Sequence, residues 1–269
     1  MEETIPVLGV YMSGTGNTKY CVERLIGDLD PDAVLTAIES DRTPELIRRA
    51  ELIVLGYPTQ FSNAPLMVRD FIRQHPALWD RKHMICLTTM GAFSGDGTGC
   101  AARVLKKYGA VVDGGLQVRM PDSVCDKKAL KKSREENHRI VVKAGRKIDQ
   151  AAEQIRKGNY PGEGLGFFSH ILGLFGQRLW FYGKTSHYAA GLTIDPEKCV
   201  GCGTCAKVCP MGNIRMQTAP SPEPDKTLTR AVPGTKCAMC YRCISLCPTQ
   251  AITLLGNKVV EQCRIEKYE

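Results

Sequence analysis

The chain has 269 residues but no apolar run of the roughly 18 to 20 residues that a membrane-spanning helix needs. Its first residues, Met1-Glu2-Glu3, are acidic, whereas a secretory signal begins with basic residues. We therefore expect a cytoplasmic protein without a transmembrane segment. The net charge is +8 and comes mostly from the middle of the chain, yet the basic stretch Lys127 to Lys157 contains no aromatic residue. Nucleic-acid-binding surfaces interleave the two types, so we interpret this stretch as a solvated helix face and expect no nucleic-acid partner.

Cysteine is unusually frequent for a chain of this length, with 13 copies. Thiols stay reduced in the cytoplasm, so this count points to metal or redox chemistry rather than to structural disulfides. Histidine gives no comparable signal, because its five copies show no pairing with a metal-binding or nucleophilic pattern.

Apolar runs alternate with helical patterns from the start of the chain to about position 125. Helices are expected near 17–28, 44–50, 64–75 and 98–108. Five strands are expected at Ile5–Met12, Ala33–Ile38, Leu52–Gly56, His83–Met90 and Ala110–Val118. Strands that are apolar on both faces and separated by helices predict a doubly wound parallel sheet, which binds ligands at the carboxyl ends of its strands.

The first strand ends in a run of small polar residues directly before a helix: Ser13-Gly14-Thr15-Gly16-Asn17-Thr18. The glycines let the backbone turn tightly around an anion, and the helix N-terminus offers unpaired N–H groups. Lys19 follows the threonine, so the run is neither a Walker A loop nor the dinucleotide fingerprint with its third glycine. A phosphate nest is favoured over a turn that binds nothing.

This run resembles the FMN-phosphate loop of the flavodoxins, and the five-strand spacing agrees with that family. The resemblance implies that residues 13–18 bind the FMN phosphate and that loops after the third and fourth strands hold the flavin ring. The corresponding ring contacts here are Pro58, Thr59, Gln60, Phe61, Asn63, Gly91, Ala92 and Phe93. Tyr57 is a further aromatic residue in reach of the ring. For each of Tyr57, Phe61 and Phe93, packing in the protein core is nearly as good an interpretation as contact with the flavin.

The second loop departs from the electron-carrier flavodoxins. Its Pro-Thr-x-Phe-x-Asn pattern is closer to that of the flavodoxin-like NAD(P)H quinone oxidoreductases, and no glycine occurs at positions 57–63. A dedicated nicotinamide fingerprint is absent from the sequence.

The middle of the chain contains two helical patterns. Apolar residues at three- and four-residue steps predict an amphipathic helix over Ala129–Lys157 that closes the α/β domain. The stretch Leu165–Tyr182 is rich in Phe, Leu and Trp but too short and polar to span a membrane. It is either a hydrophobic arm that packs between two domains or a surface helix for a membrane or partner. Because the Lys-rich face of interfacial helices is missing, we favour the packing arm over peripheral membrane contact.

The C-terminal part of the chain contains the same cysteine pattern twice. Each copy has the form C-x2-C-x2-C-x3-C-P, with cysteines at 199, 202, 205 and 209 and again at 237, 240, 243 and 247. Structural zinc sites pair two C-x2-C couplets across a longer spacer, whereas three cysteines at three-residue steps suit an iron–sulfur cube. The spacing therefore predicts 4Fe-4S clusters rather than zinc.

This segment resembles the bacterial two-cluster ferredoxins, in which the fourth cysteine of each run ligates the other cluster. The resemblance implies one cluster held by Cys199, Cys202, Cys205 and Cys247, and a second held by Cys237, Cys240, Cys243 and Cys209. Of the five remaining cysteines, Cys21 and Cys86 are expected in the core, and Cys100 is the one to test for reactivity.

Together these resemblances predict three parts: a flavodoxin-like FMN-binding domain at 1–157, a hydrophobic connector at 158–189 and a small α+β ferredoxin-like domain with two 4Fe-4S clusters at 190–269. FMN exchanges one or two electrons and each cluster exchanges one. We therefore expect an anaerobic-type electron-transfer protein that serves a redox protein or reductase partner. The alternative is an FMN-dependent oxidoreductase that reduces a small acceptor such as a quinone. No catalytic acid or base is predicted.

Overall fold

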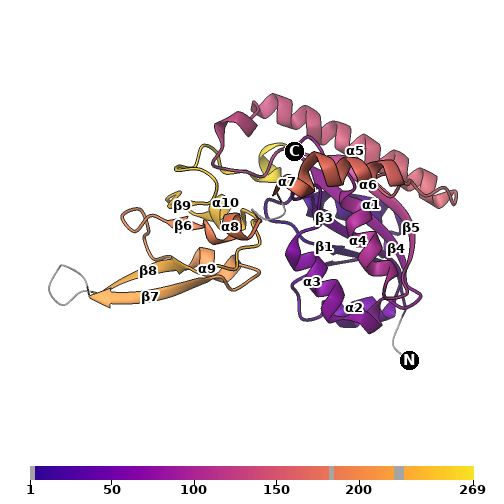
Figure 1. Ribbon diagram of the computed structural model, residues 1–269, viewed down its shortest axis with the longest axis horizontal. Coiled ribbons are helices and arrows are strands. Elements are labelled where there is room, and N and C mark those ends of the chain that lie inside the picture. Colours follow the sequence, from indigo (N-terminus) through magenta and orange to yellow (C-terminus); the bar gives the residue numbers. More distant parts are fainter. Residues whose placement is uncertain (1–3, 182–184, 221–226) are drawn as a thin grey trace.

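The computed structural model describes residues 4–181, 185–220 and 227–269. Five parallel strands form one sheet in the order β2-β1-β3-β4-β5 (Figure 1). This is the strand order of the flavodoxin-like class of doubly wound folds. The strands are β1 (Ile5–Tyr11), β2 (Val34–Ala37), β3 (Ala50–Pro58), β4 (His83–Met90) and β5 (Val111–Arg119).

Helices cover both faces of this sheet. The five helices are α1 (Asn17–Leu29), α2 (Thr43–Arg49), α3 (Leu66–Gln74), α4 (Gly97–Lys106) and α5 (Arg134–Arg156). One apolar core packs α1 and α5 against the sheet, and a second core packs α2, α3 and α4 against its other face. The predicted α/β architecture is therefore confirmed, and Cys21 and Cys86 lie fully buried in these cores as expected.

Most boundaries differ from the predicted ones by one or two residues, and two of the differences have a clear consequence or cause. β3 runs to Pro58, so its last residues belong to the strand rather than to the following loop. α5 begins at Arg134 and not at Ala129, because Ser133 and Glu136 form a reciprocal capping box there. Such a cap satisfies N–H groups of the first turn and fixes where the helix starts.

The connector forms α6 (Phe167–Gly173), a π-helical turn (Leu174–Arg178), α7 (Leu179–Phe181) and α8 (Thr185–Ala190). Our expectation of a packed hydrophobic arm is wrong for the first three of these. Their large apolar side chains are exposed, at Phe167, Phe168, Leu172, Phe175, Leu179 and Trp180. Polar residues of the same segment face the protein instead. No helix in the described part of the chain is long and apolar enough to cross a membrane.

The C-terminal part is small and two-fold repetitive. Its elements are β6 (Thr193–Ile194), α9 (Thr204–Val208), β7 (Ile214–Pro220), β8 (Thr227–Pro233), α10 (Arg242–Leu246) and β9 (Ile252–Thr253). β6 pairs with β9, and β7 forms a long hairpin with β8 that projects away from the α/β domain (Figure 1). α9 and α10 occupy equivalent positions of the two cysteine repeats.

Candidate functional site

The eight cysteines of the repeats lie in two groups of four. The first group is Cys199, Cys202, Cys205 and Cys247, which line one small cavity. The second group is Cys209, Cys237, Cys240 and Cys243, which line another. Each group takes its fourth cysteine from the other sequence run, which is the crossed arrangement that the ferredoxin resemblance implies. Ligation itself stays a prediction.

Backbone geometry places the thiols around these cavities in both halves alike. Left-handed φ angles occur at Gly201 and Gly203 in the first run, and at Met239 and Tyr241 at the matching positions of the second. Glycine adopts this conformation without cost, whereas other residues are held there by their surroundings. Backbone N–H groups also donate to sulfur at equivalent positions, 3.3 Å from Asn213 to Cys209 and from Ala251 to Cys247.

The four cysteines of each group surround a small cavity and do not converge on a single atom position. Among the described residues, no three His, Cys, Asp or Glu side chains lie close enough to hold a single metal ion. A zinc ion needs four ligands that converge within about 2.3 Å of it, while a 4Fe-4S cube needs thiolates spread around its corners. The apolar side chains between the cysteines, such as Ile244 and Ile252, would exclude water from a cluster.

The loop at residues 13–18 has the features of an anion site. Gly16 begins α1 in a left-handed conformation, and no side chain caps the helix, so the first N–H groups stay available. The side chains of Thr15, Asn17 and Thr18 are buried here and bond within the protein, to Ser123, to the Pro121 carbonyl and to Thr89. A cavity of about 470 Å³ beside the loop is lined by Lys19 and Lys207, and by Arg242 with its ion-pair partner Glu39. The N–H groups at the start of α1 and the two lysines fit a phosphate.

The second cysteine group lies directly against this loop. The carbonyl oxygen of Cys240 occupies the space over Gly14, where a Cβ atom would come within 1.6 Å of it. Arg242 donates a 2.8 Å hydrogen bond to the Ser13 carbonyl and forms a 2.6 Å ion pair with Glu39. The C-terminal tail approaches from another side, where the Ile265 N–H donates to the Thr15 carbonyl at 2.9 Å.

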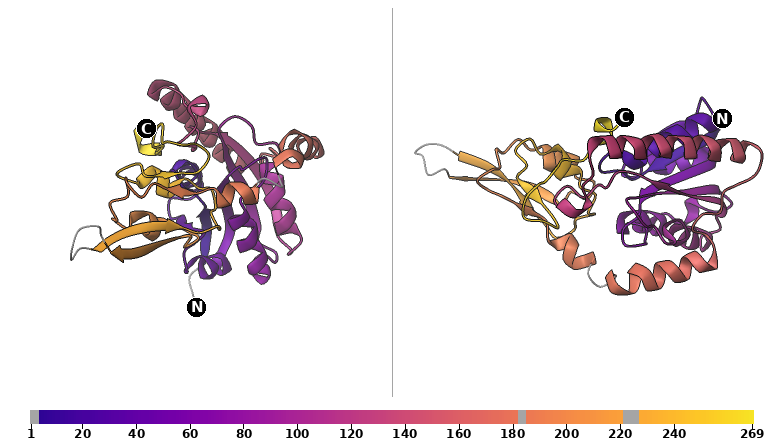
Figure 2. Two further views of the ribbon diagram at one scale, coloured as in Figure 1. Left: turned by 60° about the vertical axis from the view of Figure 1, so that its left-hand side comes forward. Right: turned by 90° about the horizontal axis from the view of Figure 1, so that it is seen from above.

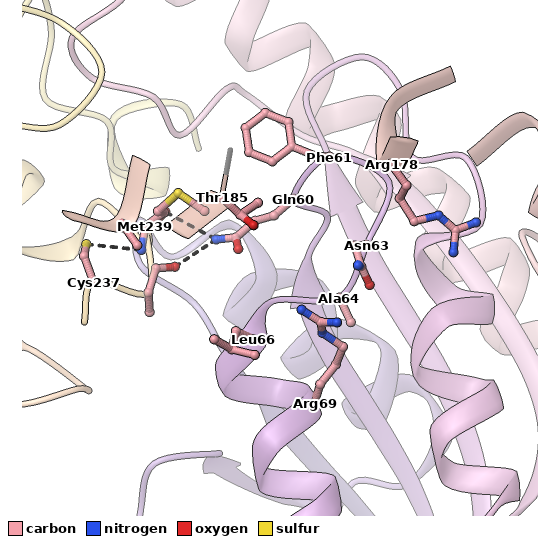
Figure 3. Close-up of a pocket in the computed structure, with 12 residues that line it drawn as sticks. Gln60, Phe61, Asn63, Ala64, Leu66, Arg69, Arg178, Thr185, Cys237 and Met239 are labelled. Atoms are coloured by element: carbon pink, nitrogen blue, oxygen red, sulfur yellow. Dashed lines mark hydrogen bonds between the residues drawn. The ribbon is translucent and has the colours of Figure 1, made fainter. Parts of the chain in front are cut away.

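The second predicted flavin loop also contacts the second cysteine group. Gln60 Nε2 donates to the carbonyl of Ala238 at 2.9 Å, between two cysteines of the group (Figure 3). Gln60 and Asn63 close a tight turn by two backbone hydrogen bonds, and Phe61 and Ser62 inside it have positive φ angles. Such angles are rare for residues other than glycine and cluster at functional sites.

A cavity of about 400 Å³ opens beside this turn, within the size range of small-molecule and cofactor sites. Its walls come from three parts of the chain (Figure 3): the second loop and α3, the connector, and the segment Cys237–Met239. Phe61 lines it and stacks on Phe181 with 4.9 Å between ring centroids. Tyr57, by contrast, is fully buried and donates to the Gly97 carbonyl, so it is a core residue rather than a ring contact.

The third predicted loop lies apart from this cavity. Ala92 and Phe93 are exposed, and Gly91 packs beside the carboxylate of Asp122. Pro58 ends β3, and Thr59 ties the second loop to the third through a 2.9 Å hydrogen bond with Ser94. The structure therefore brings residues 60–63 to the cysteines of the second group and leaves residues 91–93 outside the cavity.

A buried ion network fixes the connector beside these loops. The carboxylate of Asp96 is completely buried and contacts Arg103 at 2.7 Å, Arg178 at 2.7 Å and His170 at 2.9 Å. Cys100 lies in the same network, where burial raises the pKa of its thiol. This opposes the thiolate that reactivity needs, so the interest in Cys100 as a reactive cysteine is not supported. The pairing of Asp96 with a histidine of the connector had no signal in the sequence.

Two further polar groups in the C-terminal core were not predicted from the sequence. Cys125 and Cys263 lie side by side in this core, and Lys131 Nζ lies 2.7 Å from the Cys263 sulfur. Asp126 accepts hydrogen bonds from the Tyr241 hydroxyl and from the N–H groups of residues 254–256. Burial alone would raise the pKa of Asp126, but these donors hold it below its ordinary value.

Comparison with known proteins identifies the C-terminal segment. Residues 191–251 match the family model of the 4Fe-4S dicluster domain. This segment contains all eight cysteines of the two groups. The chain therefore joins a flavodoxin-like fold to a 4Fe-4S dicluster segment.

Two curated relatives match over part of the chain. UacF of Escherichia coli (strain K12), whose name describes an oxidoreductase, is 34% identical over 74 residues, 28% of this chain and 11% of its own length. A probable iron-sulfur protein of the Frd operon of Proteus vulgaris is 28% identical over 78 residues, 25% of this chain and 50% of its own length. The chain thus spans half or less of these relatives.

Solved flavodoxin structures match the other part. An archaeal flavodoxin is 18% identical with a TM-score of 0.42 and covers 56% of this chain and 99% of its own. The two-electron reduced Megasphaera elsdenii flavodoxin is 21% identical with a TM-score of 0.41 and covers 55% and 98%. These scores are low, so the fold assignment depends on the strand order and not on them.

Proposed function

We propose that the protein is an electron relay in which FMN, bound by the α/β domain, exchanges electrons with two 4Fe-4S clusters and through them with a redox protein partner. The observation that carries this proposal is the contact of the second cysteine group with two of the three predicted flavin loops, residues 13–18 and the loop at Gln60. The Cys240 carbonyl packs on Gly14, and the Ala238 carbonyl accepts from Gln60. A cluster held there would be the neighbour of a flavin held by these loops.

The order of the relay follows from the same contacts. The second group faces the α/β domain, whereas the first group lies toward the β7–β8 hairpin, with Gly201 packed against Thr229. Cys202 of the first group is the exposed member of the eight. The first cluster would therefore meet an external donor or acceptor, and the second would connect it to FMN.

FMN supplies chemistry with one or two electrons, and each cluster supplies a one-electron step. This chain's own residues contribute binding and exclusion of water. Residues 13–18 would hold the phosphate. Arg242 fixes the backbone of this loop through the Ser13 carbonyl, and Gln60 fixes the backbone of the cluster loop against the flavin domain. Ile244 and Tyr241 bury the space around the second group. No catalytic acid or base is required for electron transfer between these centres.

The relay is tested on protein purified without oxygen, with iron, sulfide and flavin measured on one sample. We expect about eight irons and one FMN per chain. A one-electron donor is then mixed rapidly with the protein, and flavin reduction is followed by visible absorption. The variant Cys240→Ala should slow flavin reduction strongly, and the matched variant Cys86→Ala, a buried cysteine outside both groups, should not. Equal rates in both variants would reject the relay.

The cavity beside Phe61 favours one alternative, an FMN-dependent oxidoreductase that reduces a small acceptor. It contains the apolar side chains of Leu66 and Ala189 together with the cations Arg69 and Arg178, a lining suited to a planar molecule with polar oxygens. The reduced protein is mixed with a soluble quinone in the absence of any partner. Reoxidation of the protein, with one hydroquinone formed for every two electrons lost, would support the enzyme, and transfer only to an added redox protein would support the relay.

A further inference from the structure

The connector turns its apolar face away from the protein. Phe168, Leu172, Phe175 and Leu179 recur at steps of four, three and four residues, so they form one stripe along the helical segment. Their exposed fractions are 81, 60, 61 and 60%, and the neighbouring Phe167 and Trp180 are 72 and 71% exposed. Isolated exposed apolar residues are ordinary, but six large ones gathered on residues 167–180 mark an interaction surface.

The polar face of the same segment is fixed to the α/β domain. His170 and Arg178 contact the buried carboxylate of Asp96, and Gln177 accepts a 2.8 Å hydrogen bond from Ser62. Each of these contacts would have to break for the segment to turn its apolar face inward. Breaking a buried ion pair is costly, so the outward orientation is built into the fold.

We propose that this stripe and its neighbours Phe167 and Trp180 bind to the surface of a lipid bilayer, with the helical segment 167–181 lying in its plane. At about 1.5 Å per residue the segment spans about 22 Å, shorter than the roughly 30 Å core of a membrane, so it cannot cross. Segments that lie in the interface bury Phe, Leu and Trp at the boundary of headgroups and acyl chains. The proposal is independent of the relay proposed above.

Charge favours a lipid surface as the occupant. The sequence from Gly164 to Ile194 contains no aspartate or glutamate, and the whole chain has a net charge of +8. Anionic headgroups therefore meet no carboxylate along this segment, and the net positive charge of the chain does not repel them. A protein partner or a second copy would have to offer recesses for the protruding Phe167 and Phe168, whereas acyl chains adapt to their shape.

The position of the stripe is compatible with docking of the whole molecule. α6 lies on the face of the α/β domain that α4 covers, and α5 runs along the opposite side (Figure 2). The β7–β8 hairpin and the first cysteine group extend beyond one end of that domain (Figures 1 and 2). A bilayer under the connector would leave the first cysteine group accessible to a partner.

The full-length protein is floated with vesicles of phosphatidylcholine, alone and mixed with phosphatidylglycerol. We expect it to rise with the vesicles, more strongly with the anionic lipid. Substitution of Phe168→Asp together with Phe175→Asp should lower the partition coefficient by at least about tenfold for each aromatic removed. Val142→Asp on α5, which also replaces an exposed apolar residue, should leave binding unchanged.

The folded state of the variants is checked by flavin content and thermal unfolding, which should match the unsubstituted protein since the replaced rings contact solvent. Failure of the unsubstituted protein to float with either vesicle would overturn the proposal. Sedimentation velocity without lipid tests the competing occupant. A dimer that the double substitution splits, with no flotation, would assign the stripe to a second copy of the chain and reject the bilayer.

Discussion

The carbonyl oxygen of Cys240 lies over Gly14, where it fills the space that any side chain at position 14 would need. A predicted cluster ligand and a predicted phosphate-binding residue, from opposite ends of the chain, are thus in direct contact. The absence of a Cβ atom at Gly14 makes this approach possible. Glycine at this position therefore serves the junction of the two domains as well as the turn around an anion.

Replacing Gly14 by alanine should disturb this junction. A Cβ atom 1.6 Å from a backbone oxygen cannot be accommodated by a side-chain rotation, so Cys240 has to move. We expect a loss of about 1–3 kcal/mol in unfolding free energy, together with weaker flavin binding. Thermal unfolding and bound flavin are the measurements. Gly27→Ala is the control, because no atom lies within 4 Å of its added Cβ and alanine favours a helix.

The crossed cysteine groups predict opposite results for two similar variants. Cys209→Ala should remove the cluster next to the flavin loops although residue 209 belongs to the first sequence run, and Cys247→Ala should remove the other cluster. Iron should fall to about four per chain in both. Rapid mixing should show that flavin reduction through the clusters is lost in Cys209→Ala. EPR should show that the cluster next to the flavin loops is retained in Cys247→Ala. Exchanged results would show ligation without crossing.

The two arginines that pair with Asp96 should contribute unequally to the stability of the protein. The Arg178 side chain is 12% exposed and the Arg103 side chain 42%, so the Arg178 pair is the less screened. We expect Asp96→Ala to cost about 3–5 kcal/mol, because it leaves the largely buried guanidinium of Arg178 without its carboxylate partner. Arg178→Ala should destabilise more than Arg103→Ala. Chemical denaturation and limited proteolysis of the connector measure these effects, and equal costs for the two arginines would contradict this ranking.

Asp126 should link stability to acid pH. Its pKa in the folded protein is lower than its ordinary value, so its contribution is present at neutral pH and is lost as the pH falls below about 4. Asp126→Asn should lower the unfolding free energy at pH 7 by about 1–3 kcal/mol, and with it the melting temperature, since it removes the charge that four donors share. The difference from the unsubstituted protein should shrink toward acid pH. Asp41→Asn, at an exposed position, serves as the control and should show no such trend.

Sequence patterns predicted the parts of this structure that depend on short-range chemistry. The apolar runs of β1 and β4 reflect burial, and the small-residue loop before α1 reflects the need for a tight turn. The cysteine spacing reflects ligation. Contacts across long separations could not be predicted in this way. Asp96 and Arg178 lie far apart in the chain, and neither position has a pattern that names its partner.

For the connector, the sequence pattern could not show which face of the helix points toward the protein. Its three- and four-residue spacing specifies an amphipathic helix equally well with either face toward the protein. The buried carboxylate of Asp96 decides the question by attracting the polar face, and the apolar face is left in solvent. The third predicted flavin loop is a further case, because residues 91–93 follow the fourth strand, as the resemblance requires, without lining the cavity.

The C-terminal domain is attached to the α/β domain at both of its ends. The connector enters it at one end, and the tail after Cys263 returns to the phosphate loop, where Ile265 bonds to Thr15. Closing such a chain adds little entropic cost and keeps the two domains at a high effective concentration. In the proposed relay, electron exchange between them would therefore be a first-order event whose rate does not depend on how much protein the cell contains, unlike the collision of a separate ferredoxin with a separate flavodoxin.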